Sequence, residues 1–433
     1  MRLPWGRKVG WGRLKCAIEI AYYLTIFPYR QSENDMTNQE VLIAGAGPVG
    51  LSAAMALASA GIRVRVFELE NQLIDDPRAT TFHPPTLDML EPYGVSSVMV
   101  QKGILCPHWQ IRWHPSGERA VFDVSVLQND TKHPYRLQCE QTVLSQALLD
   151  RLLTMPEVSV EFGAAVQQVS QDETGASVTF DREGRTETIR GAWVIGADGA
   201  HSAVRKSLGL EFEGSVYPET NLIATVRFPF EDHLEGLSNV SYCWRDGGNF
   251  SLLRVRDVWR VAIYPLADKT IEEQLTPESI EAALQHIVPQ SQPYKVLALR
   301  AYRAHQRMVS KYRVGRVFLA GDAAHLTSPT GGMGLNGGVH DALNLAEKLI
   351  AVMRQGAPES LLDRYERQRR PVVQDAIIAQ SHANRARMRE LDPEKRRASL
   401  RALQEICADR DKLYKHMLNT SMISGLRQAA QVE

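Results

Sequence analysis

Six residues near the start of the chain have the types and spacing to hold a dinucleotide: Gly45-Ala-Gly47-Pro48-Val-Gly50. Gly45 would permit a tight turn, Gly47 would let the backbone approach a pyrophosphate, and Gly50 would let a helix pack closely on a strand. Free N–H groups and the positive end of the helix dipole would then face the phosphates. The pattern predicts a dinucleotide site, and a glycine-rich structural turn is the alternative.

The flanking residues predict the elements that position this turn. Residues 41–44 are a short apolar run typical of a buried strand, and residues 51–61 predict a helix that ends at glycine. Residues 62–67 predict a second strand that leads to Glu68. A carboxylate at this place accepts hydrogen bonds from ribose hydroxyls, which favours FAD or NAD over NADP.

Two later segments repeat the pattern of an apolar strand that runs into a pair of glycine and aspartate. One leads to Asp198-Gly199 and the other to Gly321-Asp322. Ligands bind at the carboxyl ends of strands in open α/β sheets, so Asp322 is expected to reach a ligand. Residues 329–338 are rich in glycine, which predicts a loop that exposes N–H groups before a helix over residues 339–353.

The three segments, in this order, resemble the class A FAD-dependent aromatic hydroxylases, the p-hydroxybenzoate hydroxylase group, over roughly residues 40–378. The resemblance implies a mixed α/β fold: a Rossmann-type FAD-binding domain, an inserted antiparallel substrate sheet and C-terminal helices. The FAD contacts that it implies in these segments are Gly45, Gly47, Pro48, Gly50, Glu68, Asp198, Gly199, Gly321, Asp322, Gly332, Gly334, Leu335 and Asn336.

Shorter matches extend the resemblance. Pro77-Arg78-Ala79 is similar to the family's loop whose arginine reaches the cofactor, although Arg78 could be a plain surface residue. Gln141 stands where the family has a flavin-contacting glutamine at a helix start. Residues 362–371 resemble the family's closing helix, with Gln368 in place of the expected Glu. The loops look nearest to the phenol and 3-hydroxyphenylpropionate hydroxylase branch, without its thioredoxin-like domain.

This pattern divides the chain into alternating parts. The FAD-binding domain would comprise three segments, interrupted by two segments of the substrate domain and followed by helices. The expected boundaries are 1–35 for an extension, 36–110, 136–212 and 306–372 for the FAD-binding domain, 111–135 and 213–305 for the substrate domain, and 373–433 for the C-terminal helices.

The substrate half is expected to be an antiparallel meander. Residues 221–230, 240–244, 248–254 and 259–265 are short, aromatic and β-branched, with turn signals between the last three. The aromatic residues of these strands could line an apolar pocket or belong to the core. The candidates for the pocket are Tyr242, Trp244, Phe250 and Tyr264, together with His108, Trp109 and Arg112 from an earlier segment.

The resemblance implies a monooxygenase that uses FAD, NADH or NADPH, and O2. It implies hydroxylation of an electron-rich aromatic or N-heteroaromatic ring through a flavin C4a-hydroperoxide. The resemblance also implies that NAD(P)H binds near Asp198 and Arg205, since Asp198-Gly199 belongs to a motif implicated in both FAD and NAD(P)H binding, and that Pro329 lies near the oxygen-transfer site. His325 is expected to be structural, and no general base is evident.

The sequence leaves other flavin chemistries open. A flavin-dependent reductase, a quinone-precursor hydroxylase at a membrane surface and a non-catalytic flavin redox sensor all fit the nucleotide motifs. A halogenase is disfavoured, because residues 109–113 do not match the Trp-x-Trp-x-Ile-Pro motif.

Composition narrows the partners and the compartment. The chain has 50 basic and 50 acidic side chains, so it lacks the positive charge that nucleic-acid binding requires. Its five cysteines lack metal-ligand spacing, which indicates free thiols in a reducing cytoplasmic compartment, without a metal site. Residues 1–35 are too short in apolar sequence to span a bilayer and are expected to be a disordered extension or an upstream-start artefact, with an interfacial helix as the alternative. A homodimer stays open.

Overall fold

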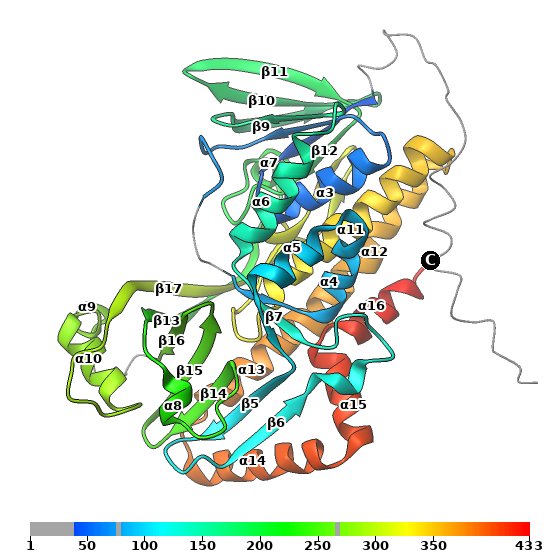
Figure 1. The fold of residues 1–433 in the computed structure, drawn as a ribbon. Coiled ribbons are helices and arrows are strands. Elements are labelled where there is room, and N and C mark those ends of the chain that lie inside the picture. Colours follow the sequence, from blue (N-terminus) through cyan, green and yellow to red (C-terminus); the bar gives the residue numbers. More distant parts are fainter. Residues whose placement is uncertain (1–38, 75–78, 265–268) are drawn as a thin grey trace, which may run out of the picture. The chain divides into compact units, whose positions relative to one another are not determined.

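The computed structural model describes residues 39–74, 79–264 and 269–433, and the statements below concern these residues. The predictions for residues 1–35 and for Arg78 lie outside them. The described chain alternates between two sheets that lie at opposite ends of the ribbon, with long helices running between them (Figure 1). In this part of the chain no helix has both the length and the hydrophobicity needed to cross a bilayer.

The first sheet is the parallel sheet predicted from the glycine motif. The strands of the three predicted nucleotide segments, β1, β12 and β19, are neighbours in this sheet, and β2 lies on the other side of β1. Among its strands only β18 runs antiparallel. In spatial order the strands are β18 (Arg313–Val314), β19 (Val317–Leu319), β12 (Trp193–Gly196), β1 (Val41–Ala44), β2 (Val64–Phe67) and β8 (Val158–Glu161).

The second sheet is a mixed sheet of eight strands that contains the predicted meander. β14, β15 and β16 pair antiparallel in succession, as expected, whereas β5 joins β14 in parallel. The order is β20 (His325–Leu326), β17 (Val296–Met308), β13 (Glu213–Val226), β16 (Val258–Ile263), β15 (Gly248–Val255), β14 (Val240–Arg245), β5 (His108–Trp113) and β6 (Arg119–Asp123).

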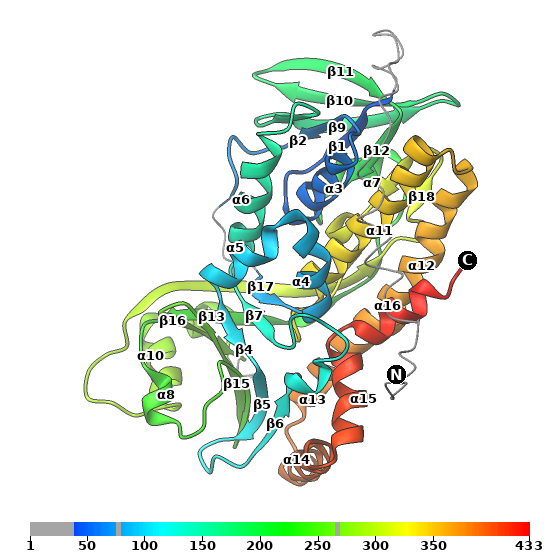
Figure 2. The ribbon, with the colours of Figure 1, turned by 45° about the vertical axis from the view of Figure 1, so that its right-hand side comes forward.

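β13 differs from its predicted range. The strand begins at Glu213 and ends at Val226, and Phe230–His233 form the short helix α8. Phe230 is fully buried against Trp259 and Tyr294, so its aromatic character reflects core packing and not strand continuation. β13 pairs along almost its whole length with β17, which is one residue shorter, and this pair connects the two halves of the described chain (Figure 2).

Two three-stranded sheets complete the strands. One is the meander β11 (Arg185–Gly191), β10 (Ala176–Arg182) and β9 (Ala165–Gln171). The other is β3 (Thr81–Phe82), β7 (Arg136–Gln138) and β4 (Ile104–Cys106).

Helices cover the parallel sheet and extend from it toward the eight-stranded sheet. The helices of the first two thirds of the chain are α3 (Pro48–Ser59), α4 (Pro84–Leu90), α5 (Val95–Lys102), α6 (Gln141–Leu152), α7 (Ala203–Ser207), α9 (Ile271–Gln274) and α10 (Pro277–Gln285). The later ones are α11 (Met333–Gln355), α12 (Asp363–Val372), α13 (Ala379–Arg389), α14 (Pro393–Ala408), α15 (Arg410–Thr420) and α16 (Ile423–Ala430).

The charged segment over residues 385–426 predicts one or two amphipathic helices, with Asp392-Pro393 as a helix-start signal, and the structure contains more than that. α14 begins where the Asp392-Pro393 signal predicted, with Asp392 accepting from two backbone N–H groups. A second aspartate, Asp409, caps α15 in the same way, and Met422 in the left-handed conformation starts α16. The breaks were missed because caps inside a charged segment resemble ordinary surface residues.

Three large hydrophobic cores organise the described elements, and a fourth, small cluster forms around Met333, Ile377 and Met422. The largest surrounds the parallel sheet, α3 and α11. The other two occupy opposite faces of the eight-stranded sheet: one lies beneath α13, α14 and α15, and the other beneath α8 and α10. Each aromatic residue of the meander therefore faces one core or the other, according to strand alternation.

Candidate active site

The glycine turn between β1 and α3 has the shape that close packing at a nucleotide site requires. Gly45 has φ +100°, and a Cβ there would collide with the Ala197 carbonyl, at the end of β12. A Cβ on Gly50 would collide with the carbonyl of Gly45. Both positions therefore exclude a side chain for reasons of packing within the protein.

Gly47 differs, because a Cβ there would meet nothing within 4 Å. It is the N-cap of α3, no side chain caps the helix, and Pro48 occupies the first turn. The N-terminal N–H groups of α3 are thus left for a ligand, as a diphosphate requires. Glu68 lies at the end of β2, where its Oε2 accepts from the Ala46 N–H at 2.7 Å. The residues present fit the adenosine diphosphate half of FAD.

The other two motifs converge on this turn. Gly321 has φ +59°, and a Cβ there would lie 2.9 Å from Cγ2 of Val49 in α3 and 3.5 Å from Cα of Gly338 in α11. Asp322, next along the chain, is exposed. Segments about 280 residues apart in sequence thus pack closely against each other, as the three-motif resemblance implies.

The glycine-rich segment forms less loop than the sequence predicted. α11 begins at Met333, after Gly332 as an N-cap with φ +66°, so residues 334–338 lie in its first turns. Glycine costs about 1 kcal/mol in a helix interior, but packing overrides this cost here. A Cβ on Gly338 would lie 2.7 Å from Val49, and one on Gly337 would lie 2.8 Å from Ile377. The glycines let α11 approach its neighbours.

Asn336 fastens the start of α11 to the segment before α4. Its Oδ1 accepts from the His83 N–H at 2.9 Å and from Oγ1 of Thr86 at 2.6 Å. Its Nδ2 donates to the carbonyls of Thr81 and Gly332. The amide is fully engaged within the protein, so in this structure Asn336 positions the loop predicted to contact the flavin.

A buried ionic network supports the turn before Asp322. Asp341 on α11 accepts from Nε of Arg369 and pairs with Nε2 of His325, each at 2.7 Å, and also accepts from the Gly321 N–H at 3.2 Å. Burial opposes ionisation of Asp341, but the charges and hydrogen bonds of Arg369 and His325 outweigh it and lower its pKa to about 2. His325 is structural here, as expected from the sequence.

Asp198 and Arg205 are also held within the fold. Asp198 accepts from Oγ of Ser202 and from the Val204 N–H at the start of α7. Burial raises the pKa of Asp198. Arg205 is buried and donates to the carbonyls of Ala323 and Ala200. Arg205 thus braces the turn that contains Asp322, and its contact with NAD(P)H stays a prediction.

Gln141 begins α6, and its backbone N–H donates to the Ala79 carbonyl at 3.0 Å. The predicted arginine-bearing loop therefore ends beside the predicted glutamine.

Pro329 is exposed, and its carbonyl accepts from the Gly332 N–H at 3.0 Å. That carbonyl keeps a second lone pair for a ligand.

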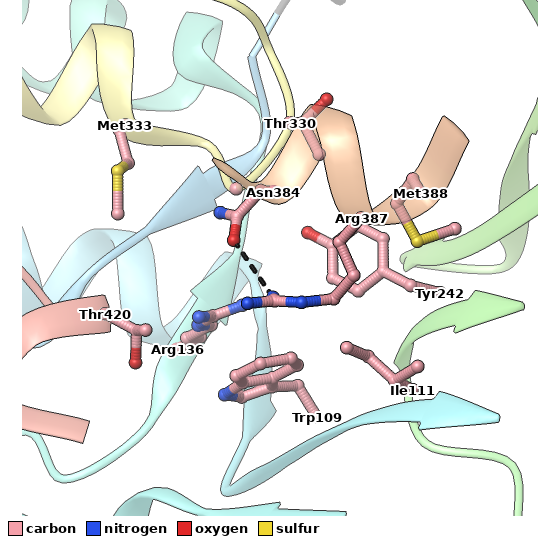
Figure 3. Close-up of a pocket in the computed structure, with 11 residues that line it drawn as sticks. Trp109, Ile111, Arg136, Tyr242, Thr330, Met333, Asn384, Arg387, Met388 and Thr420 are labelled. Atoms are coloured by element: carbon pink, nitrogen blue, oxygen red, sulfur yellow. Dashed lines mark hydrogen bonds between the residues drawn. The ribbon is translucent and has the colours of Figure 1, made fainter. Parts of the chain in front are cut away.

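A pocket lies directly beside this loop (Figure 3). Its empty volume is about 400 Å³, which includes open space at its mouth. Its walls come from the eight-stranded sheet, from β7, from the loop before α11 and from the C-terminal helices. The lining residues are Trp109, Ile111, Arg136, Tyr242, Thr330, Gly331, Met333, Asn384, Arg387, Met388 and Thr420.

The structure divides the aromatic residues predicted for this pocket. Tyr242 lines it, with burial raising the pKa of its hydroxyl against the influence of Arg136. Tyr264 lies behind the wall, where its hydroxyl bonds the side chain of Thr330 and burial raises its pKa.

Three of the candidates lie elsewhere. Phe250 pairs with Cys243, so it faces the opposite core. Trp244 shares the face of Tyr242 but is fully buried, and its Nε1 donates to the Arg387 carbonyl. His108 is exposed beside Asp123, because strand alternation turns it away from Trp109.

Most of the lining residues were not predicted for the pocket, and four of these belong to α13 and β7. Asn384, Arg387 and Met388 belong to α13, and Arg136 to β7. The helical residues stand in a charged segment whose pattern indicates only a surface helix. For Arg136 the sequence offers one indication of a special role, since it is the only charged residue of the short strand Arg136–Gln138.

The parallel sheet with its uncapped glycine turn, and the two Gly-Asp segments that meet it, define an FAD-binding flavoprotein with a substrate sheet. Comparison with known proteins makes the assignment specific. The chain belongs to the family whose model is described as "FAD binding domain", which matches residues 38–380.

Its relatives include named monooxygenases. The chain is 35% identical to para-nitrophenol 4-monooxygenase of Pseudomonas sp. (strain WBC-3), over 89% of this chain and 96% of that protein. It is 35% identical to 6-hydroxy-3-succinoylpyridine 3-monooxygenase HspB of Pseudomonas putida, over 77% and 84%. The crystal structure of p-nitrophenol 4-monooxygenase PnpA from Pseudomonas putida DLL-E4 matches with a TM-score of 0.83 and 32% identity, over 90% and 98%. These findings confirm the predicted resemblance, the fold class, FAD as cofactor and the monooxygenase class.

Proposed function

We propose that the protein hydroxylates an electron-rich aromatic or N-heteroaromatic ring, with NADH or NADPH as reductant and O2 as oxidant. One oxygen atom of O2 would enter the ring in place of hydrogen. The other would leave as water, with the two electrons supplied by NAD(P)H. The observation that carries the proposal is the pocket beside Thr330 and Gly331, because these residues belong to the loop expected to face the flavin.

Bound FAD would supply the redox chemistry, and the residues of this chain would bind, orient and shield the reactants. The uncapped start of α3 would hold the diphosphate, and Glu68 the ribose. Asp322 would contact the ribityl chain from a turn braced by Asp341 and Arg205.

The pocket walls would keep water from the reacting centre. Ile111, Met333 and Met388 present apolar surface, and Trp109 and Tyr242 offer aromatic faces to a flat substrate. Exclusion of water matters because a reactive oxygenated intermediate would otherwise decay unproductively. The apolar pocket favours this function over a sensor without a substrate, which needs no such cavity.

The activity test is isotopic. We expect the purified protein to show a flavin spectrum and an aromatic-stimulated oxidation of NADH or NADPH. The product formed under 18O2 should gain one labelled oxygen by mass spectrometry. Flavin that neither nucleotide reduces, with any phenol or hydroxypyridine present, would refute the proposal.

Asp322→Ala tests the cofactor contact separately. We expect this variant to purify with less than about a tenth of the wild-type FAD, because a charge-assisted contact to the ribityl chain is lost. Asp150→Ala, at an exposed position of α6, is the matched control and should retain its flavin. Stoichiometric flavin in Asp322→Ala would show that the contact lies elsewhere.

A further inference from the structure

Two donor groups in the pocket have no acceptor. Nε1 of Trp109 and Nε of Arg136 are buried and lack a hydrogen-bond partner within the described chain. Both groups can only donate. A buried donor without an acceptor costs about 1–3 kcal/mol, so this arrangement is expected to be completed by a ligand rich in acceptors.

The pocket also carries positive charge without an acidic partner. Arg136 is 3% exposed, and its guanidinium lies over the Trp109 ring at 4.5 Å. Within the described part of the chain, the Arg387 side chain donates a single hydrogen bond, a long one of 3.4 Å to Oδ1 of the neutral Asn384. Among the described residues no carboxylate lines the pocket or forms an ion pair with either arginine. In Figure 3, Arg387 crosses the pocket between Thr330 and Trp109.

The positive charges of the two arginines also lower the pKa values of neighbouring histidines. Burial, then the charges of Arg387 and Arg136, lower the pKa of His416 to about 4. Burial, then Arg136, lower the pKa of His83 to about 3, although its bond to the Gly331 carbonyl opposes this. Both rings are therefore neutral near pH 7, and neither adds a positive charge to that of the arginines.

The rest of the lining suits a ring. Ile111, Met333 and Met388 supply apolar contacts, and Trp109 stacks on Phe122 with centroids 4.0 Å apart. This stack fixes the plane of the indole, whose unpartnered Nε1 lies at its edge. An aromatic ring with a negatively charged oxygen would satisfy the apolar walls and the donors together.

We propose that Arg136 and Arg387 bind an oxyanion of the aromatic substrate in this pocket, either a phenolate or a ring carboxylate. This assignment rests on the proposed function, because it takes the pocket to be the substrate site. Charge-assisted hydrogen bonds are about twice as strong as neutral ones, and they would offset the desolvation of both partners. Arg136 and Arg387 are therefore specificity-determining residues.

The test is equilibrium binding to the FAD-loaded protein, without NAD(P)H, by calorimetry. Matched pairs of ligands differ in charge but little in shape: benzoate against benzamide, and 4-nitrophenolate against 4-nitroanisole. We expect at least one anion to bind about tenfold or more tightly than its neutral partner. The pair that shows this preference identifies the oxyanion as carboxylate, phenolate or both.

Variants then assign the effect to the arginines. Arg136→Met and Arg387→Met should each reduce the preference for the anion to less than about threefold, while the affinity for the neutral ligand stays similar. Arg136→Lys should keep part of the preference, because it keeps the charge. Arg397→Met is the matched control, since Arg397 is exposed on α14 outside the pocket, and it should leave the preference unchanged.

The results separate this inference from the proposed function. Equal binding of anions and neutral partners, absence of anion binding at millimolar concentration, or an intact preference in both methionine variants would overturn the oxyanion assignment. Isotope incorporation from 18O2 could still be observed in each of those cases. Conversely, oxyanion binding without substrate-stimulated reduction would support the assignment while refuting the hydroxylase activity.

Discussion

Two buried arginines, in two regions of the molecule, differ in what surrounds them. Arg369 is fully buried beside the parallel sheet, where Asp341 accepts from its Nε and the Gly337 carbonyl accepts from its Nη2. Arg136 is almost as buried beside the pocket, where the described residues around it supply an aromatic face and a tyrosine hydroxyl but no acid. The first charge is compensated by an acid within the fold, whereas the second has no acidic partner among the described residues. Burial alone therefore does not distinguish a structural arginine from a functional one. The presence or absence of an acidic partner distinguishes them.

The largest expected effect comes from removing the acid in the compensated region. Asp341→Ala should lower the free energy of unfolding by about 3–5 kcal/mol, because it leaves Arg369 buried and unpaired. The measurement is urea denaturation of the FAD-loaded protein. Asp257→Ala, which removes an exposed ion pair with Arg227, is the control and should cost less than about 1 kcal/mol. An equally small loss of unfolding free energy in Asp341→Ala would show that the two regions do not differ in this respect.

Acid should weaken the same region. The pKa of Asp341 is lowered to about 2 in the folded protein, below its unfolded value near 4, so its contribution is present above about pH 4 and is lost as pH falls toward 2. The contribution is about 2–3 kcal/mol. The stability difference between wild type and Asp341→Asn should therefore shrink as urea unfolding is repeated from about pH 5 to about pH 3. A difference independent of pH would show that the charge of Asp341 does not matter.

The smallest stability effect is expected in the pocket. Arg136→Met should change the free energy of unfolding by less than about 1 kcal/mol, or raise it, because an unpaired buried charge is replaced by an apolar side chain. Arg369→Met is the matched comparison and should lower the free energy of unfolding by about 3–5 kcal/mol, because it leaves Asp341 buried without its arginine partner. Urea denaturation of both variants at neutral pH gives the answer. Equal losses would mean that Arg136, too, is a structural residue.

The sequence predicted the cofactor half better than the substrate half for a physical reason. A phosphate-binding turn depends on a few glycines in one short segment, so Gly45, Gly47 and Gly50 are visible without a fold. The three-segment resemblance then indicated that distant motifs meet, as Gly321 and Val49 do. The start of α11 was predicted too late, because glycines chosen for close helix packing look the same as glycines chosen for a loop.

The pocket depends instead on which face of a strand or helix meets which neighbour. Tyr242 and Trp244 share a face, yet only Tyr242 reaches the cavity, because α13 covers Trp244. Arg387 stands in a helix whose many charges look alike in sequence. Only the fold distinguishes the guanidinium that points into a cavity from those that face solvent.

The order of the pocket walls along the chain has a consequence for how the molecule assembles. Trp109 and Thr420 face one cavity, and Asn384, Arg387 and Met388 lie beyond the segment that the family model covers. Contacts between such distant segments carry a large loop-closure entropy, so they are expected to form late in folding. The nucleotide turn, built from neighbouring residues of β1 and α3, can form early. A newly synthesised chain would thus form the turn between β1 and α3 first and its substrate cavity last, only after α15 has left the ribosome.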